Sequence, residues 1–305
     1  MSARLLLLCP GQGGQHQAMF DLARTSASAA ALLDSWSGQL PTPALDDATM
    51  LANRSAQPLI VAATLAMWSA IRDFTPQPDL VAGYSIGELT AYAIAGALTP
   101  TAAVELASLR AGLMNASLAT HPGQALLAIS GLPLKRVTPL LQANAYHLSI
   151  ETGDDSCVSG GPASALAQLE LAVEAAGGRS RRLPVEVASH TPYMQQAVAP
   201  FAAALRERAF ATLTTPVLAG VDASTVTRSD QAIPLLSRQL AEPIRWLACM
   251  DACAEAGISV ALELGPGGAL ARMLQARQPH IQCRSVADFR TLDGIRRWLE
   301  RALEQ

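Results

Sequence analysis

The chain has 305 residues, of which 50% are hydrophobic and 15% are charged, so it can bury a large core and global disorder is excluded. Its formal net charge of −3 gives no basic footprint for nucleic acid. The 5 cysteines are scattered and include no C-x-x-C pair, which favours reduced thiols over a disulfide or zinc framework.

Short apolar strands alternate with helices in the first part of the chain. Arg4 to Cys9 is predicted to form a buried strand that runs into the glycine-rich turn from Pro10 to Gln15. Helices are predicted at residues 57–74, 88–95 and 101–118, and a strand at residues 79–83. This alternation predicts an α/β fold with a parallel sheet.

The middle of the chain has a different order of elements. Strands are predicted at residues 124–131, 147–152, 156–160 and 179–185, and helices at residues 134–142 and 162–176. This βαββαβ order fits a ferredoxin-like unit. We therefore expect a small subdomain at residues 124–187, inserted between the two parts of the main domain, residues 1–123 and 188–305.

The α/β pattern resumes after this insert. Helices are predicted at residues 192–209, 233–240, 245–256, 268–277 and 292–303, and strands at residues 216–219, 259–264 and 281–286. The longest mostly apolar stretch, Leu59 to Ile71, is too short to span a membrane, and the apolar start is too short for a signal peptide. We expect a soluble, cytoplasmic protein that binds no membrane, no nucleic acid and no metal.

Ser85 is the first candidate for chemistry. The segment Gly83-Tyr84-Ser85-Ile86-Gly87 matches G-x-S-x-G and lies between a predicted strand and a predicted helix, as a nucleophile elbow requires. The N-terminal N–H groups of the following helix can stabilise an oxyanion there. An ordinary glycine-rich turn is the alternative, which this context makes the weaker one.

A serine nucleophile needs a base, and the chain has 5 histidines. His190 follows the predicted insert, where the chain returns to the main domain, and is the first choice. His16 lies beside the first glycine-rich turn and is the second. Spacing alone does not decide between them.

Several motifs follow one another in a recognisable order. They are Pro10 to Gln15, Gly83 to Glu88, Leu109 to Met114, Val187 to His190, Gln239-Leu240, Pro243 to Trp246 and Glu263 to Gly267. Together they resemble the malonyl-CoA:acyl carrier protein transacylase family, including the acyltransferase domains of polyketide and fatty acid synthases. The resemblance covers essentially the whole chain and implies a hydrolase-like three-layer α/β domain with a ferredoxin-like insert.

The resemblance implies a catalytic dyad that contains no carboxylate. Ser85 is then the nucleophile, His190 is its general base, and Gln239 orients the histidine through a hydrogen bond. It also implies a clamp and an oxyanion hole: Arg110 pairs with the free carboxylate of a malonyl group, for which its planar guanidinium is suited. The backbone N–H groups of Gln12 and Ile86 then form the oxyanion hole.

The implied reaction is ping-pong transfer of malonyl from malonyl-CoA, through an ester on Ser85, to the thiol of an acyl carrier protein, with no bound cofactor. Tyr84 departs from the family, which usually has histidine there. This departure and the short chain resemble the transacylase component of malonate decarboxylase, whose carrier bears a CoA-like prosthetic group. We therefore expect that role, with a phosphopantetheine-dependent transacylase of fatty acid or polyketide synthesis as the alternative.

Three other functions compete with this interpretation. A serine hydrolase or thioesterase shares G-x-S-x-G, but Asp154 and Asp155, the carboxylates considered as its third catalytic residue, lie inside the predicted insert. A dinucleotide-binding protein is disfavoured because His16 and Leu270 stand where G-x-G-x-x-G needs its third glycine. A non-enzymatic subunit that docks a carrier protein predicts no acyl-serine.

Overall fold

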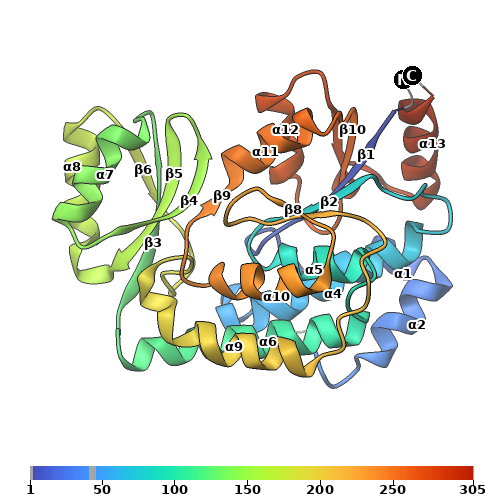
Figure 1. Ribbon diagram of the computed structural model, residues 1–305, viewed down its shortest axis with the longest axis horizontal. Helices are drawn as coiled ribbons and strands as arrows, with labels where there is room; N and C mark the ends of the chain where they lie inside the picture. The colour runs from blue at the N-terminus through green and yellow to red at the C-terminus, as the bar shows by residue number, and fades with distance from the viewer. Residues whose placement is uncertain (1–2, 41–45, 305) are drawn as a thin grey trace.

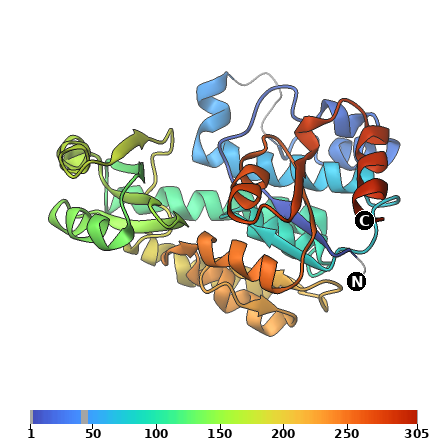
Figure 2. The ribbon, with the colours of Figure 1, turned by 90° about the horizontal axis from the view of Figure 1, so that it is seen from above.

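The computed structural model describes residues 3–40 and 46–304. Within these residues the chain forms a six-stranded sheet, in the order β11-β10-β1-β2-β7-β8, and a five-stranded sheet, in the order β6-β3-β5-β4-β9. In Figure 1 the small sheet and its helices lie on the left, and the large sheet and its helices lie on the right. Figure 2 shows the same division from above.

The large sheet is parallel except at one edge. Its strands are β1 (Leu5–Cys9), β2 (Leu80–Gly83), β7 (Val217–Leu218), β8 (Thr225–Val226), β10 (Val260–Glu263) and β11 (Gln282–Ser285). All neighbours from β11 to β7 pair in parallel, whereas β8 pairs antiparallel with β7. The predicted parallel sheet is therefore found from β11 to β7, and β8 makes the whole sheet a mixed one. The chain turns back after β7 in a short hairpin, where the Ala219 N–H donates to the Ser224 carbonyl oxygen at 2.9 Å.

Helices cover both faces of the large sheet. The α-helices of the described residues are α1 (Asp21–Arg24), α2 (Ala27–Ser35), α3 (Asp47–Leu51), α4 (Asn53–Ile71), α5 (Gly87–Ile94), α6 (Pro100–Ala116), α7 (Leu134–Ala143), α8 (Leu166–Ala175), α9 (Gln195–Glu207), α10 (Ser229–Arg238), α11 (Trp246–Glu255), α12 (Ala269–Arg277) and α13 (Leu292–Leu303). No helix of the described residues is both long and apolar enough to cross a membrane.

The side chains of β1 alternate between the two halves of the core, as the period of a strand requires. Leu5 and Leu7 lie in the cluster that contains the buried faces of α4, α5 and α6. Leu6 and Leu8 lie in the cluster that contains α11 and α12. Because both faces of β1 are buried, its sequence is a continuous apolar run.

The small sheet is built mainly from the predicted insert. Its strands are β3 (Gln124–Ser130), β4 (His147–Gly153), β5 (Ser156–Pro162), β6 (Arg179–Arg182) and β9 (Ile244–Arg245). With α7 and α8 the first four follow the predicted βαββαβ order, and their pairs are antiparallel. The sequence did not predict β9, which comes from outside residues 124–187 and pairs parallel with β4. The division into two domains stays a prediction.

The two faces of the small sheet have different partners. Leu127 and Ile129 of β3 pack in a cluster with α7 and α8. Leu126 of β3 and Val158 of β5 belong instead to the cluster that contains Trp246 and α11. The small sheet therefore packs on the α11 side of the large sheet, and the remote end of the molecule carries α13 (Figure 1).

Candidate active site

Ser85 lies at the sharp turn between β2 and α5. Its φ of 56° is in the left-handed region, which non-glycine residues seldom adopt. The side chain is half-buried, and the helix that follows begins two residues later, at Gly87. The backbone therefore holds Ser85 in the strained conformation that is typical of a nucleophile elbow.

The glycines beside Ser85 are required by close backbone contacts. A Cβ atom at Gly83 would lie 2.2 Å from the backbone nitrogen of Glu88. A Cβ atom at Gly87 would lie 2.1 Å from the carbonyl oxygen of Cys9, at the end of β1. Any other residue at either position would push the turn away from the sheet.

His190 is the residue that the structure places against Ser85. The Ser85 Oγ and the His190 Nε2 are 2.7 Å apart. His190 is fully buried and has a φ of 61°. Its backbone N–H donates to the Leu240 carbonyl oxygen at 2.9 Å. His16, the second candidate, is exposed and does not contact Ser85.

The ring of His190 is held in one tautomer. Its Nδ1 lies 2.5 Å from the carbonyl oxygen of Gln239, which can only accept, so Nδ1 carries the proton and Nε2 is free to accept from Ser85. Burial, and then the positive charge of Arg110, lower the pKa of His190 from 6.5 to about 3, against the opposing hydrogen bond to Gln239. The imidazole is therefore neutral at pH 7.

Gln239 connects the serine, the histidine and the arginine. It follows the last residue of α10 and is fully buried. Its backbone oxygen accepts from His190, and its side-chain Nε2 donates to the Ser85 carbonyl oxygen at 3.1 Å. Its side-chain Oε1 accepts from Arg110 Nη2 at 3.1 Å. The main-chain oxygen of Gln239 thus accepts the hydrogen bond from the histidine, and the side chain of Gln239 bonds to the other residues.

Arg110 lies on the buried face of α6, with 1% of its surface exposed. Besides Gln239, it donates from Nη1 to Gln57 Oε1 on α4 at 2.7 Å. Burial lowers the pKa of Arg110 to about 10, against the opposing charge of Glu88, so the guanidinium stays charged at pH 7. Its Nε–H is buried and has no partner among the described residues. A buried cation with an uncommitted N–H is chemically suited to bind a carboxylate.

Glu88 and Gln57 belong to this network and were not predicted from the sequence. Glu88 is fully buried on α5, and its Oε2 accepts from Gln239 Nε2 at 2.6 Å and from the Gly220 N–H at 2.9 Å. The available signal was a charged residue in the mostly apolar run from Gly87 to Ile94. For Gln57 the signal was a second buried polar residue, Asn53, four positions earlier on the same helix face.

The proposed oxyanion donors both have unused backbone N–H groups. Ile86 directly follows Ser85 and caps α5, and Gln12 follows Gly11 in the turn after β1. A Cβ atom at Gly11 would lie 2.9 Å from the Tyr84 carbonyl oxygen, so this turn lies against the elbow. Neither the Gln12 N–H nor the Ile86 N–H has a hydrogen-bond acceptor in the described part of the chain. Their role as an oxyanion hole stays a prediction.

A groove of about 1210 Å³ opens beside the elbow, between the two sheets. We call it the inter-sheet groove and define it by Gln12, Tyr84, Val158, Leu183, Met250 and Arg272. Asp154, considered above for a hydrolase triad, is exposed at its edge and forms an ion pair with Arg277 at 2.8 Å. His190 Nδ1 therefore donates its hydrogen bond to a backbone oxygen, that of Gln239, and not to Asp154.

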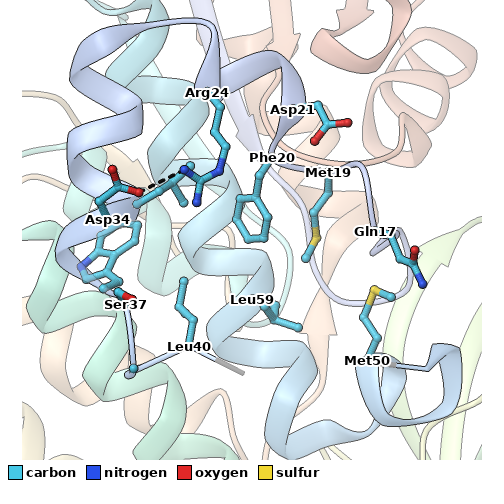
Figure 3. Close-up of a pocket in the computed structure, with 13 residues that line it drawn as sticks. Gln17, Met19, Phe20, Asp21, Arg24, Asp34, Ser37, Leu40, Met50 and Leu59 are labelled. Atoms are coloured by element: carbon cyan, nitrogen blue, oxygen red, sulfur yellow. Dashed lines mark hydrogen bonds and ion pairs between the residues drawn. The ribbon is translucent and has the colours of Figure 1, made fainter. Parts of the chain in front are cut away.

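A second pocket, of about 250 Å³, lies under α1 and α2 (Figure 3). Phe20 and Leu59 line it, and so do Arg24 and Asp34, which form an ion pair at 3.1 Å. It contains none of the predicted site residues. Within residues 3–40 and 46–304 there is also no group of three or more histidine, cysteine, aspartate or glutamate residues that could hold a metal ion.

Comparison with known proteins shows which family this chain is similar to. The profile of the acyl transferase domain matches residues 6–288. A malonyl CoA-acyl carrier protein transacylase of Mycobacterium tuberculosis strain H37Rv is 31% identical over 303 residues, which covers 95% of this chain and 99% of that protein.

Solved structures agree over the whole length. FabD from Acinetobacter baumannii superposes with a TM-score of 0.90 at 26% identity, covering 99% of this chain and 100% of the other. A malonyl-transacylase solved in complex with a type II PKS acyl-carrier protein superposes with a TM-score of 0.85 at 25% identity, covering 99% of each chain.

Proposed function

The chain belongs to the acyl transferase domain family, and from that premise we propose that it moves a malonyl group from malonyl-CoA to the thiol of an acyl carrier protein, through an ester on Ser85. The observation that carries this proposal is the 2.7 Å contact between Ser85 Oγ and the neutral, buried His190. The charged Arg110, joined to both through Gln239, supports malonyl as the acyl group.

The first step loads the enzyme. His190 Nε2 accepts the proton of Ser85 as its oxygen attacks the thioester carbonyl, and the backbone N–H groups of Gln12 and Ile86 stabilise the oxyanion. The C–S bond then breaks, and the CoA thiolate takes the proton from His190. The malonyl ester remains on Ser85 with its carboxylate on Arg110.

The second step reverses the chemistry with another thiol. The carrier thiol gives its proton to His190 and attacks the ester carbonyl, and the Ser85 oxygen leaves and regains a proton from His190. The inter-sheet groove offers both thiols a route to the serine, because it is lined by Tyr84, which precedes Ser85, and by Gln12, in the turn that lies against the elbow. Arg179 and Arg181 line it, are exposed and make no ion pair within the described ranges, which suits the phosphates of CoA or of a carrier's prosthetic group.

The role in malonate decarboxylase, expected from Tyr84, is a more specific assignment than malonyl transfer to an acyl carrier protein. The relatives above are named malonyl CoA-acyl carrier protein transacylase, FabD and malonyl-transacylase, and they favour the alternative assignment to a phosphopantetheine-type carrier. Tyr84 packs edge-on against Trp246, with ring centroids 5.2 Å apart, and lines the groove. The decarboxylase role rests on Tyr84, which stands in place of the family's usual histidine, together with the short chain, and not on this ring contact.

Intact-protein mass spectrometry tests the proposal. Wild-type protein mixed with malonyl-CoA is expected to gain one malonyl group, and Ser85→Ala protein is expected to gain none. Addition of a carrier protein with a phosphopantetheine thiol should then move the group to the carrier faster than water removes it. Loss of the adduct to water at the same rate with and without carrier would instead indicate a thioesterase, and an unmodified wild-type protein would contradict the proposed function.

A further inference from the structure

Glu88 is a buried carboxylate to which no step of the reaction has yet been assigned. It lies three residues after the nucleophile on α5 and is fully buried. Only Oε2 is used: it accepts from Gln239 Nε2 at 2.6 Å and from the Gly220 N–H at 2.9 Å. Oε1 is buried with no partner in the described part of the chain. Any role of Glu88 therefore depends on the two hydrogen bonds that Oε2 accepts.

The amide of Gln239 lies between an acidic and a basic side chain. Its nitrogen faces the Glu88 carboxylate and its oxygen faces the Arg110 guanidinium, so the amide dipole is aligned favourably with both. The two N–H bonds of the amide are both used, one on Glu88 and one on the Ser85 carbonyl oxygen. Without an acceptor at Glu88, one buried N–H of this amide would lose its partner, which disfavours the observed orientation of the side chain.

We propose that Glu88 is a positioning residue for malonyl recognition: its Oε2 holds the Gln239 side chain in the orientation that presents Oε1 to Arg110. Arg110 then keeps a fixed direction, with its Nε–H free for the acyl carboxylate. The inference rests on the proposed function and adds that selectivity for a carboxylated acyl group depends on an oxygen of Glu88, which Gln239 and Arg110 separate from the substrate.

The position of the acceptor, more than its charge, is what this arrangement needs. Glu88→Gln can place its amide oxygen at the position of Oε2 and still accept from Gln239 and Gly220. Glu88→Asp keeps the charge but withdraws the carboxylate by one methylene, out of reach of a 2.6 Å contact. The two variants therefore separate a hydrogen-bond role from a charge role, and both preserve a polar group of similar size in the core.

The experiment is competitive loading of Ser85 from an equimolar mixture of malonyl-CoA and acetyl-CoA, followed by intact-protein mass spectrometry. The ratio of malonyl to acetyl adduct does not depend on the folded fraction, so a merely structural defect would not change it. We expect Glu88→Gln to keep the wild-type ratio within about twofold, and Glu88→Asp to lower it by about tenfold, as loss of a hydrogen bond to a charged group predicts.

Glu263→Asp is the matched control. Glu263 is also buried and also accepts a backbone N–H, from Ala271 at 2.8 Å, but it has no hydrogen bond to Gln239 or Arg110. It should lose stability and keep the ratio. A wild-type ratio in Glu88→Asp, or a lowered ratio in Glu88→Gln, would overturn the inference while wild-type loading still supports the proposed function. Wild-type protein that loads acetyl as readily as malonyl would contradict both.

Discussion

Ser85 and His190 both hold the left-handed backbone conformation, with φ angles of 56° and 61°, and their side chains meet at 2.7 Å. Neither residue is a glycine, so each carries a conformational cost of about 1–2 kcal/mol. Other contacts hold them there: the glycines around Ser85 allow close packing, and the Leu240 carbonyl oxygen accepts from the His190 N–H.

Removal of the strain at Ser85 should stabilise the protein. Ser85→Gly relieves the left-handed conformation, whereas Ser85→Ala does not, although both lose the hydroxyl. We expect the free energy of unfolding of Ser85→Gly to exceed that of Ser85→Ala by about 1 kcal/mol, in spite of the flexibility of glycine in the unfolded chain. Denaturant titration measures the difference, and equal values for the two variants would show that the turn is not strained.

Arg110 should control the choice of acyl group. Arg110→Ala is expected to lower the rate of malonyl loading relative to acetyl loading by about tenfold or more, because a charge-assisted pair with the malonyl carboxylate is lost. Arg110→Lys keeps the charge without the planar guanidinium, so its ratio of malonyl to acetyl loading should lie between those of wild type and Arg110→Ala. The competitive loading assay gives the ratio, and an unchanged ratio in Arg110→Ala would show that the clamp is elsewhere.

The base should stay active well below neutral pH. Because the pKa of His190 is lowered to about 3, its imidazole is neutral from pH 5 to pH 8, and the rate of Ser85 loading should show no inflection near 6.5. Rapid-quench loading at a series of pH values measures this, with Glu88→Gln as the control that removes the neighbouring titratable carboxyl. An inflection near 6.5 in both proteins would contradict the low pKa.

Glu88 should make the protein less stable as pH rises. Burial raises the pKa of Glu88 from 4.5 to about 7, so the folded state binds more protons than the unfolded state between these values. The free energy of unfolding therefore falls across that window, by about 3 kcal/mol from this residue alone. Glu88→Gln lacks the effect, so the stability of the variant relative to wild type should rise from pH 4.5 to pH 7. A difference that does not change with pH would contradict the raised pKa.

The local motif at Ser85 could be read from the sequence because its geometry is local. Gly83 and Gly87 mark the close approach of backbone around the serine, and the strand before and the helix after it follow from apolar patterning. His190 needed the resemblance to a family to separate it from His16. The contact between His190 and Ser85 joins residues 105 positions apart, and hydrophobic periodicity contains no information on such a pair.

Two of the missed elements, β8 and β9, depend on pairing across the chain. β8 and β9 have two residues each, too few for a periodic pattern, and exist only because Val217 and Ile150 supply partners. The contribution of Gln239 was predicted as a hydrogen bond to the histidine, but its side chain bonds to three other residues. A sequence motif identifies a residue and does not say whether its backbone or its side chain acts.

β9 ties the small sheet to the segment that holds the base. Ile244 pairs with Ile150 of β4, the Arg245 N–H donates to the Gly220 carbonyl oxygen, and Gln239 and Leu240, a few residues earlier, bind His190. Anyone building chimeras between relatives by exchanging residues 124–187 would thus cut through a sheet and not through a linker. The exchanged segment would have to include its own counterpart of residues 244–245. Otherwise the chimera would lose the edge strand of that sheet, and with it the strand that fixes the segment in contact with its histidine.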